Sequence, residues 1–319
     1  MTIHELTPRG HRQRSARCAT VVALVLAALL AARPGQAEEL RQRFGSVTVI
    51  ADTSFARSGG ILLVRFLSSV RLGALHAVFE GRKAPAYWSR GAGLHALVPI
   101  PVTTPAGEGL LGIEVPARRG LQRLRMVFPI GPRAFPSREQ TVPESKRALL
   151  AGGEALRDGR RLMQAVRTLT PKALWEGSFF EAPVVAPPAA SFGARESYLG
   201  GEDVEDRMDG GFGDFHRGLD YPLAPGTLVR APAGGTVVMA AELRLSGRTL
   251  VLDHGRGIVS AFYHLSRIDV PEGRVVEKRQ LLGASGDSGI ATFPHLHWGI
   301  YVHGIPVDPL AVVELSKLL

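Results

Sequence analysis

The residues most able to do chemistry lie in the last third of the chain, where histidines occur at short spacings. Six of the ten histidines fall between His216 and His303. His216 and Asp220 are four residues apart, while His295 and His297 are two apart in a strand-like run. Side chains two apart on a strand point to the same face, so these two imidazoles can address one site.

A metal site is the first chemistry that these spacings predict. Two imidazoles and one carboxylate make a donor set that suits zinc and leaves a fourth position for water, which is typical of catalytic zinc. The dipeptide Tyr263-His264 ends an apolar run and supplies one more imidazole. The chain has no His-Glu-x-x-His motif. An imidazole is therefore predicted to act in place of the usual glutamate base.

Other motifs have simpler interpretations. The stretch Gly286–Gly289 (GDSG) imitates the nucleophile motif of trypsin-like serine proteases, but no matching histidine segment lies upstream. We interpret it as a tight turn, because a triad needs that histidine. His254 and His303 are predicted to be turn or surface histidines, and the isolated His76 and His95 to be surface or hydrogen-bonded histidines.

Three sequence blocks, in this order, closely resemble the lysostaphin/LytM-like family of zinc peptidoglycan endopeptidases. The blocks are HRGLDYPLAPGTLVRAPAGGTVV, LVLDHGRGIVSAFYHLSRI and PHLHWGIYVHGIPVDP. The resemblance is strong over residues 192–310. It is weaker upstream, where a β-rich segment, a helix and Leu174–Phe179 look like the amino-terminal module of some exported members.

The resemblance implies a role for each candidate residue. His216, Asp220 and His297 match the family's three zinc ligands, which implies one Zn²⁺ per chain. His264 and His295 match the two catalytic histidines that do not bind the metal. One of them would orient or deprotonate water and the other would stabilise the oxyanion or protonate the amine, and the sequence leaves open which does which.

The chain departs from the family pattern at several positions. Phe293 stands where a small glycine usually precedes the Pro-His-Leu-His motif, and Lys278-Arg279-Gln280 replaces the usual Lys-Gly-Gln. The stretch Gly200–Asp214 is long and acidic. It could be a lid over the site, but a solvated loop is the interpretation we favour, because charged glycine-rich stretches are usually solvated. Arg195 could contact substrate or lie at the surface.

Composition excludes several classes of protein. The chain has 319 residues, of which 45% are hydrophobic and 21% charged, so it is globular and has room for about two domains. Only Cys18–Ala32 is apolar enough to suggest a membrane span, and it is shorter than the ~20 residues that a span needs. A polytopic membrane protein is excluded.

The first 37 residues are predicted to be a secretory signal peptide. The basic stretch Arg9–Arg17 precedes the apolar segment, and Gly35-Gln36-Ala37 offers small residues for cleavage near Ala37. An uncleaved anchor or a buried helix is the alternative. Cleavage would remove Cys18, the only cysteine, and no disulfide could form. We expect an exported protein of the periplasm or cell envelope with no stable membrane span after cleavage.

The charge pattern excludes nucleic acid as a partner. The formal net charge is +9. Residues 1–37 hold five Arg and one Glu, so their removal leaves 33 basic and 28 acidic side chains and a charge of +5. That excess suits work near anionic wall polymers, whereas no basic run with interleaved aromatic residues is present.

The predicted fold class is mainly β, with four segments. They are a signal peptide (1–37), a β-sandwich-like amino-terminal module (38–135), a helical connector and linker (136–185), and an antiparallel β, LytM-like (lysostaphin-type) catalytic domain (186–319). Glycines predict that the helix within Pro143–Leu169 is broken. Strand-like runs occur at Ser46–Ile50, Ile61–Phe66, Leu94–Ile100, Gly109–Val115, Leu124–Ile130, Thr227–Ala231, Gly235–Ala241, Thr249–Asp253, Gly257–Tyr263 and His295–Val302.

The predicted function is that of an exported zinc metalloendopeptidase that hydrolyses peptide bonds in peptidoglycan stems or cross-links. The alternative is a catalytically inactive LytM-like module that binds the wall or activates an amidase. A secreted protease acting on proteins would differ only in its substrate. Because all five site residues are present, and this chemistry needs each of them, an active enzyme is favoured.

Overall fold

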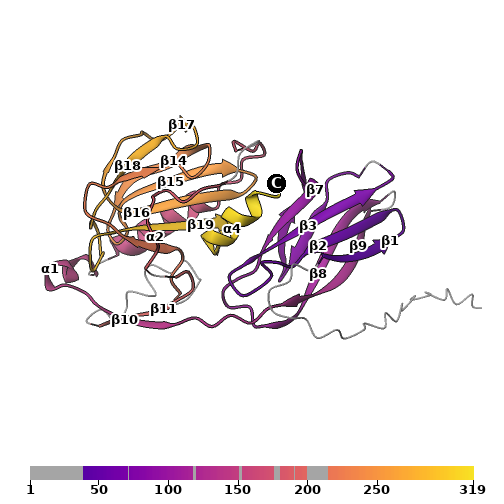
Figure 1. Ribbon diagram of the computed structural model, residues 1–319, viewed down its shortest axis with the longest axis horizontal. Coiled ribbons are helices and arrows are strands. Elements are labelled where there is room, and N and C mark those ends of the chain that lie inside the picture. Colours follow the sequence, from indigo (N-terminus) through magenta and orange to yellow (C-terminus); the bar gives the residue numbers. More distant parts are fainter. Residues whose placement is uncertain are drawn as a thin grey trace, which may run out of the picture. The chain divides into compact units, whose positions relative to one another are not determined.

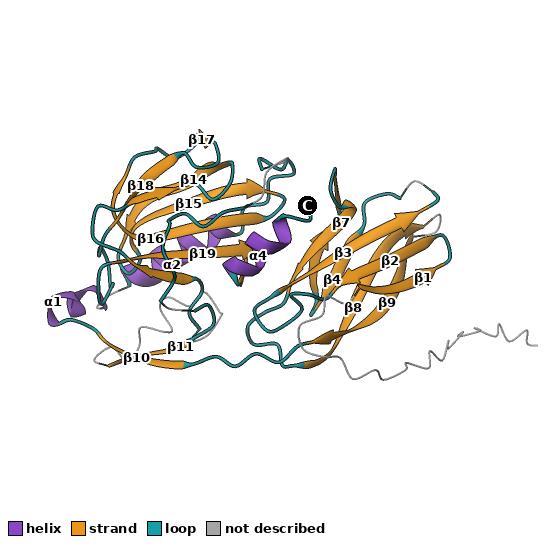
Figure 2. Ribbon diagram, in the orientation of Figure 1, coloured by secondary structure: helices purple, strands orange, loops and turns teal. Residues whose placement is uncertain are grey.

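Strands are far more abundant than helices in the described chain, as Figure 2 shows, which confirms the mainly β class. The computed structural model describes residues 39–70, 72–117, 120–150, 153–175, 180–189, 191–199 and 215–319. The predicted signal peptide, the acidic stretch 200–214 and residues 176–179 lie outside the described residues. Among the residues described, no helix is long and apolar enough to cross a membrane.

Two antiparallel sheets form the amino-terminal β-rich region (Figure 1). The first sheet consists of β1 (Glu39–Phe44), β2 (Val47–Asp52), β3 (Ile61–Ser68), β7 (Gly93–Pro99) and β6 (Tyr87–Ser89), in that order. The second consists of β5 (Arg82–Pro85), β4 (His76–Phe79), β8 (Gly107–Ala117) and β9 (Gly120–Ile130). Val49, Leu62 and Phe66 from the first sheet share one hydrophobic cluster with Leu111 and Phe128 from the second, so the two sheets pack face to face.

Alternating burial explains why these strands form. In β9, the buried residues Leu124, Met126, Phe128 and Ile130 alternate with exposed ones, which is the period of a strand with one face on a core. The strand starts at Gly120, earlier than the hydrophobic pattern indicates. Its first four residues are all exposed, so they carry no apolar signal, but they pair with β8 in register.

The connector contains the expected broken helix. Helix α1 (Glu144–Arg147) continues into a 3-10 turn at Ala148–Leu150, and α2 spans Glu154–Val166. Apolar residues of α2, including Leu162 and Val166, pack in one cluster with residues of the carboxy-terminal sheet. A short parallel pair, β10 (Ser137–Thr141) and β11 (Arg195–Leu199), was not predicted.

A nine-stranded sheet forms the carboxy-terminal region. Its main path is β12 (Leu219–Pro222), β19 (His295–Val302), β16 (Ile258–Ile268), β15 (Gly247–Gly255), β14 (Gly235–Leu243) and β17 (Val275–Val276). Off this path, β13 (Leu228–Arg230) pairs with β18 (Leu281–Ser285), β18 with β16, and β20 (Ile305–Val307) with β19. Helix α4 (Pro309–Ser316) follows, and the side chain of Asp308 accepts a hydrogen bond from the Leu310 amide at its start.

Strand β19 is central to the candidate site because it lies between β12 and β16. The register places His297 opposite Asp220 on one side and opposite Tyr263 on the other. Leu296 and Trp298 belong to a hydrophobic cluster, so the residues that alternate with them, His295 and His297, share the other face, as the two-residue spacing predicts.

Candidate metal centre

Three ligand-type atoms converge at the junction of β12 and β19. Nε2 of His216 lies 2.9 Å from Oδ1 of Asp220 and 3.0 Å from Nδ1 of His297, and that Nδ1 lies 3.0 Å from the same Oδ1. All three residues are buried. Of the residues that the structure describes, these three form the one group of histidine, cysteine and acidic side chains able to hold a metal ion.

The backbone fixes the position of His216. This residue lies just before β12, where its amide donates to the Ala194 carbonyl and its carbonyl accepts from the Gly193 amide, both at 2.8 Å. Its Nδ1 donates to the Ser191 carbonyl at 3.1 Å. An outer hydrogen bond of this kind sets the ring orientation of a metal-ligating histidine, and it leaves Nε2 for the cluster.

Gly218 permits the close approach that brings the cluster together. A Cβ atom at this position would lie 2.4 Å from the Trp298 carbonyl oxygen and 2.7 Å from Nε2 of His297. Both distances are well below van der Waals contact, so a larger residue would push β12 away from β19. The glycine between His216 and Asp220 therefore belongs to the geometry of the site.

The environment of His297 fits a metal ligand. Its ring stacks on the Tyr263 ring with centroids 4.8 Å apart and planes within 5°, which holds Nδ1 toward His216 and Asp220. The donor set is two imidazole nitrogens and one carboxylate oxygen, in a buried setting. These residues fit a zinc ion, whose catalytic sites use such ligands and keep one position open.

Electrostatics also favour a cation here. Burial lowers the pKa of His216, but the adjacent Asp220 carboxylate, together with Glu196 and the Ser191 carbonyl, raises that pKa to about 9. Burial raises the pKa of Asp220, yet His216 and His297 hold it well below its usual value. Burial lowers the pKa of His297. The cluster without an ion thus holds a proton on His216 against the Asp220 carboxylate, and a metal cation would replace that proton.

Two further histidines border the cluster. Nδ1 of His264 donates to the Ser288 carbonyl at 2.8 Å, and Nδ1 of His295 donates to the Phe293 carbonyl at 2.7 Å. Their ring centroids are 4.7 Å apart, and Nε2 of His295 lies 3.6 Å from Oδ1 of Asp220. All five residues predicted from the sequence therefore lie together.

The backbone at His264 is unusual. Its φ is +62°, a left-handed conformation that non-glycine residues rarely adopt and that is common at functional sites. The β15–β16 register shifts between Arg248 and Leu250, opposite this residue. Such an irregularity re-aims a side chain next to a site. Burial, then the neighbouring His295 and His297, hold the pKa of His264 well below its usual value, so its imidazole is neutral at pH 7.

The serine of the protease-like motif has a structural role. The Ser288 hydroxyl donates to the Leu265 carbonyl at 2.8 Å and accepts from the Arg248 amide at 2.9 Å, which agrees with the turn that we predicted. Its carbonyl orients His264. The sequence carries no signal for this role, because every residue has a backbone carbonyl.

Phe293, one of the positions where the sequence was expected to depart from the family pattern, packs its ring against the ring of His295. The two centroids are 4.6 Å apart, with planes tilted by 32°.

Of the other histidines, His254 does not fit its prediction as a turn or surface residue. It is fully buried within β15. Its Nδ1 donates to the Gly234 carbonyl and its Nε2 accepts from the Ser260 hydroxyl. Burial lowers the pKa of His254 to about 4.

His95, predicted to be at the surface or hydrogen-bonded, is buried and donates to the Gly93 carbonyl.

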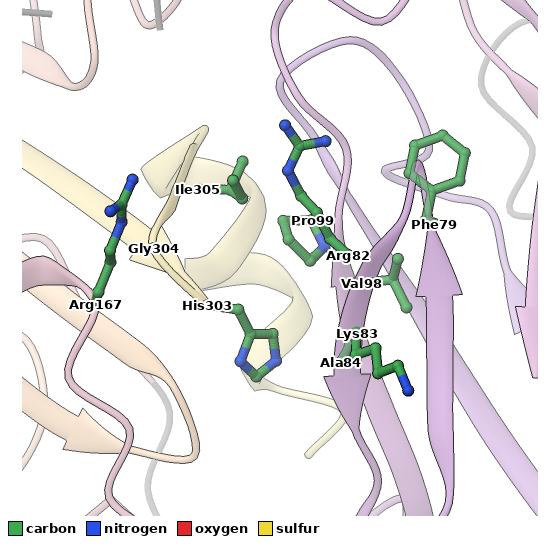
Figure 3. Close-up of a pocket in the computed structure, with 10 residues that line it drawn as sticks. All are labelled: Phe79, Arg82, Lys83, Ala84, Val98, Pro99, Arg167, His303, Gly304 and Ile305. Atoms are coloured by element: carbon green, nitrogen blue, oxygen red, sulfur yellow. The ribbon is translucent and has the colours of Figure 1, made fainter. Parts of the chain in front are cut away.

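A separate cavity of about 300 Å³ is lined by none of the five predicted site residues. His303 lies on its wall (Figure 3), in the turn between β19 and β20, and burial lowers the pKa of this imidazole to about 4. The other residues that line the cavity are Phe79, Arg82, Lys83, Ala84, Val98, Pro99, Arg167, Gly304 and Ile305.

Comparison with known proteins agrees with this geometry. Residues 214–309 match the model of peptidase family M23, and this range contains all five residues. A Haemophilus influenzae protein described as an uncharacterized metalloprotease is 41% identical over 98 residues, which are 30% of this chain and 21% of that protein. Peptidoglycan DD-endopeptidase ShyA of Vibrio cholerae is 37% identical over 95 residues, 30% of this chain and 22% of that protein. The chain thus spans about a fifth of the length of these two relatives.

A solved structure extends the likeness upstream of the matched domain. A Pseudomonas aeruginosa protein whose description assigns it to peptidase M23 has a TM-score of 0.58 and 27% sequence identity, covering 81% of this chain and 94% of that one. The chain therefore contains a peptidase M23 domain of the LytM/lysostaphin type, preceded by a β-rich region.

Proposed function

We propose that this chain is an exported zinc metalloendopeptidase that hydrolyses peptide bonds in the stems or cross-links of peptidoglycan. The observation that carries the proposal is the convergence of Nε2 of His216, Oδ1 of Asp220 and Nδ1 of His297 within 3.0 Å of one another. The substrate class is supported by the relative that is named a peptidoglycan DD-endopeptidase.

The three converging residues would hold one zinc ion. When bound, zinc supplies a Lewis acid that makes water a nucleophile near neutral pH and polarises a carbonyl group. Asp220 supplies one negative charge to the site and the two imidazoles bind as neutral ligands. The Ser191 carbonyl orients the His216 ring, and the Tyr263 ring orients His297. Neither ligand would need to rearrange to bind the ion.

His264 and His295 would carry the proton transfers. In each ring Nδ1 donates to a backbone carbonyl, so the neutral tautomer keeps its lone pair on Nε2. Either Nε2 can accept a proton from water and later return it to the amine that leaves. The depressed pKa of His264 keeps that ring unprotonated at neutral pH. We assign the acid and base roles to the two residues jointly.

Export and the division of the chain are parts of the same proposal. Residues 1–37 would be removed as a signal peptide, which would bring the enzyme to the periplasm or cell envelope. Residues 38–135 would form a separate amino-terminal module, 136–185 the connector and 186–319 the catalytic domain. Peptidoglycan is the substrate that this location would offer.

Mass analysis of muropeptides tests the proposal. Zinc-loaded protein is incubated with purified sacculi, beside His295→Ala, a chelator control and His76→Ala, a matched histidine variant in the amino-terminal region. We expect a cross-linked species to disappear and its products to appear with the wild type and His76→Ala only. Unchanged sacculi despite stoichiometric zinc would contradict the proposal and favour the inactive wall-binding or amidase-activating module.

A further inference from the structure

The strand pair β10–β11 places two charged residues beside the candidate metal centre. Figure 1 labels the two strands. Arg138 and Glu196 are register partners in this parallel pair. Nη1 of Arg138 lies 3.6 Å from Oε1 of Glu196 and 3.8 Å from Oδ2 of Asp220. Asp220 thus has its two oxygens in different environments. Oδ1 faces His216 and His297, whereas Oδ2 faces the guanidinium.

These charges are poorly screened by solvent. The side chains of Asp220 and Glu196 are only 5% and 10% exposed, and that of Arg138 is 29% exposed. Ion pairs at an open surface are worth little, but charges at this depth interact through a lower effective dielectric constant. The guanidinium therefore acts on Asp220 far more than a surface arginine would.

Neighbouring residues fix the position of the Glu196 carboxylate. Nε2 of Gln140, from β10, donates to Oε1 of Glu196 at 2.9 Å. The Thr292 hydroxyl donates to Oε1 of Gln140 at 2.8 Å, and Thr292 lies three residues before His295. A chain of hydrogen bonds thus runs from Glu196 to the segment that carries a candidate catalytic histidine.

An arginine beside a ligand carboxylate opposes metal binding, because it repels the metal cation and competes with it for the carboxylate. A second carboxylate near the same guanidinium nitrogen, Nη1, reduces both effects. Both distances from Arg138 exceed that of a hydrogen bond, so neither carboxylate captures the guanidinium.

We propose that Glu196 is a positioning residue of the metal centre. It shares the Arg138 guanidinium with Asp220 and so keeps Asp220 available to a divalent cation. This inference rests on the proposed zinc site and adds to it a charge balance outside the three ligands. Outer residues of this kind change metal affinity by about 10–100-fold when they are replaced.

The zinc affinity of Glu196→Gln tests the inference. This substitution keeps the Oε1 atom that accepts from Gln140 and removes only the charge. Competition with a chromophoric chelator, at fixed pH and ionic strength, should give a dissociation constant about 10-fold higher than that of the wild type. Glu181→Gln is the matched control, since Glu181 is likewise a carboxylate in an ion pair, with Lys278 and Arg279. Its zinc affinity should equal that of the wild type.

Charge compensation separates this role from simple structural support. Arg138→Gln should bind zinc at least as tightly as the wild type, because it removes the opposing cation. The double variant Arg138→Gln/Glu196→Gln should return to within about 3-fold of the wild type, a smaller change than loss of an outer residue brings. Weaker binding by Arg138→Gln, or a double variant weaker than Glu196→Gln, would overturn the inference, as would unchanged affinity in Glu196→Gln.

The same titration separates this inference from the proposed function. A wild type that binds no zinc contradicts the proposed function itself. A wild type that binds one zinc, with a Glu196→Gln variant of equal affinity, contradicts only the role of Glu196. Should Glu196→Gln fail to fold, Arg138→Gln decides alone. If Arg138 opposes metal binding, the zinc affinity of this variant should be equal to or higher than that of the wild type, whereas if Arg138 only supports the structure, its zinc affinity should be lower.

Discussion

The two β-rich regions both bury a histidine in a strand inside a sheet. Among the described residues, only the carboxy-terminal region joins such a histidine to a group that could hold a metal ion. His95 in β7 donates to the carbonyl of Gly93, two residues away on its own strand, and its ring meets Tyr87 edge-on at 4.3 Å. His297 in β19 faces Asp220 from the next strand and His216 from the loop before it. A buried histidine alone therefore indicates little, and convergence of donors from separate segments is the informative feature.

Buried carboxylates differ between the regions in the same way. Glu114 in β8 is buried, but it pairs with Lys83 and Arg123, and these cations satisfy it. Asp220 faces three imidazoles and, on its other oxygen, Arg138. The cations beside Glu114 already neutralise it, whereas Asp220 belongs to the group that could hold a metal ion.

Replacement of these two carboxylates should give the largest contrast. Asp220→Ala should lose stoichiometric zinc and all measurable hydrolysis of sacculi, because it removes the single anionic ligand. Glu114→Ala should keep one zinc per chain, since it lies in the other region. Metal analysis after dialysis checks both variants. Retention of tightly bound zinc by Asp220→Ala would show that the ion binds elsewhere.

His264→Ala should separate metal binding from catalysis. We expect one zinc per chain but a turnover about 10²–10⁴-fold lower, the usual contribution of a general acid or base. His76→Ala, in the amino-terminal region, should keep full turnover. Release of muropeptide products and metal content are measured on the same samples. Wild-type turnover by His264→Ala would remove this residue from the mechanism.

A glycine from each region tests whether close packing at the site is needed: Gly218, just before β12, and Gly112, in β8. Gly218→Ala places a Cβ atom 2.4 Å from the Trp298 carbonyl oxygen, so β12 should shift and turnover should fall about 10²-fold, as expected for a displacement near 1 Å. Gly112→Ala in β8 meets Val78 at 3.4 Å, an ordinary contact, and should leave turnover unchanged. Equal effects of the two substitutions would mean that close approach at Gly218 is not needed.

Acid should destabilise the carboxy-terminal region through His254, a buried histidine that we do not assign to catalysis. Burial lowers the pKa of His254 to about 4 in the folded chain, against ~6.5 when unfolded. The unfolded state therefore binds the proton first, and stability that is complete above pH 6.5 falls as the pH drops toward 4, by up to about 3 kcal/mol. Urea unfolding of metal-free protein measures this slope. His254→Gln should flatten it, and an unchanged slope would contradict the assignment.

Much of the site could be predicted because its information is local. The two-residue spacing of His295 and His297 fixes their common face, and the four-residue spacing of His216 and Asp220 fits a loop that enters a strand. Strands with alternating burial, such as β9, were predicted for the same reason.

The remainder depends on contacts between distant segments. Arg138 lies near Asp220 from β10, which pairs with β11, and the short polar strand β10 has no hydrophobic pattern. The role of Ser288 lies in its carbonyl, which every residue has. His254 looked like a turn residue because the burial of a single polar side chain depends on the packing around it.

The most direct test of the account is zinc-edge anomalous diffraction from crystals of the zinc-loaded protein. We predict one strong peak about 2.0–2.2 Å from Nε2 of His216, Oδ1 of Asp220 and Nδ1 of His297, with His264 and His295 facing it but not bonded to it. A peak at another place, or one in which His295 replaces any of these three ligands, would contradict the central claim.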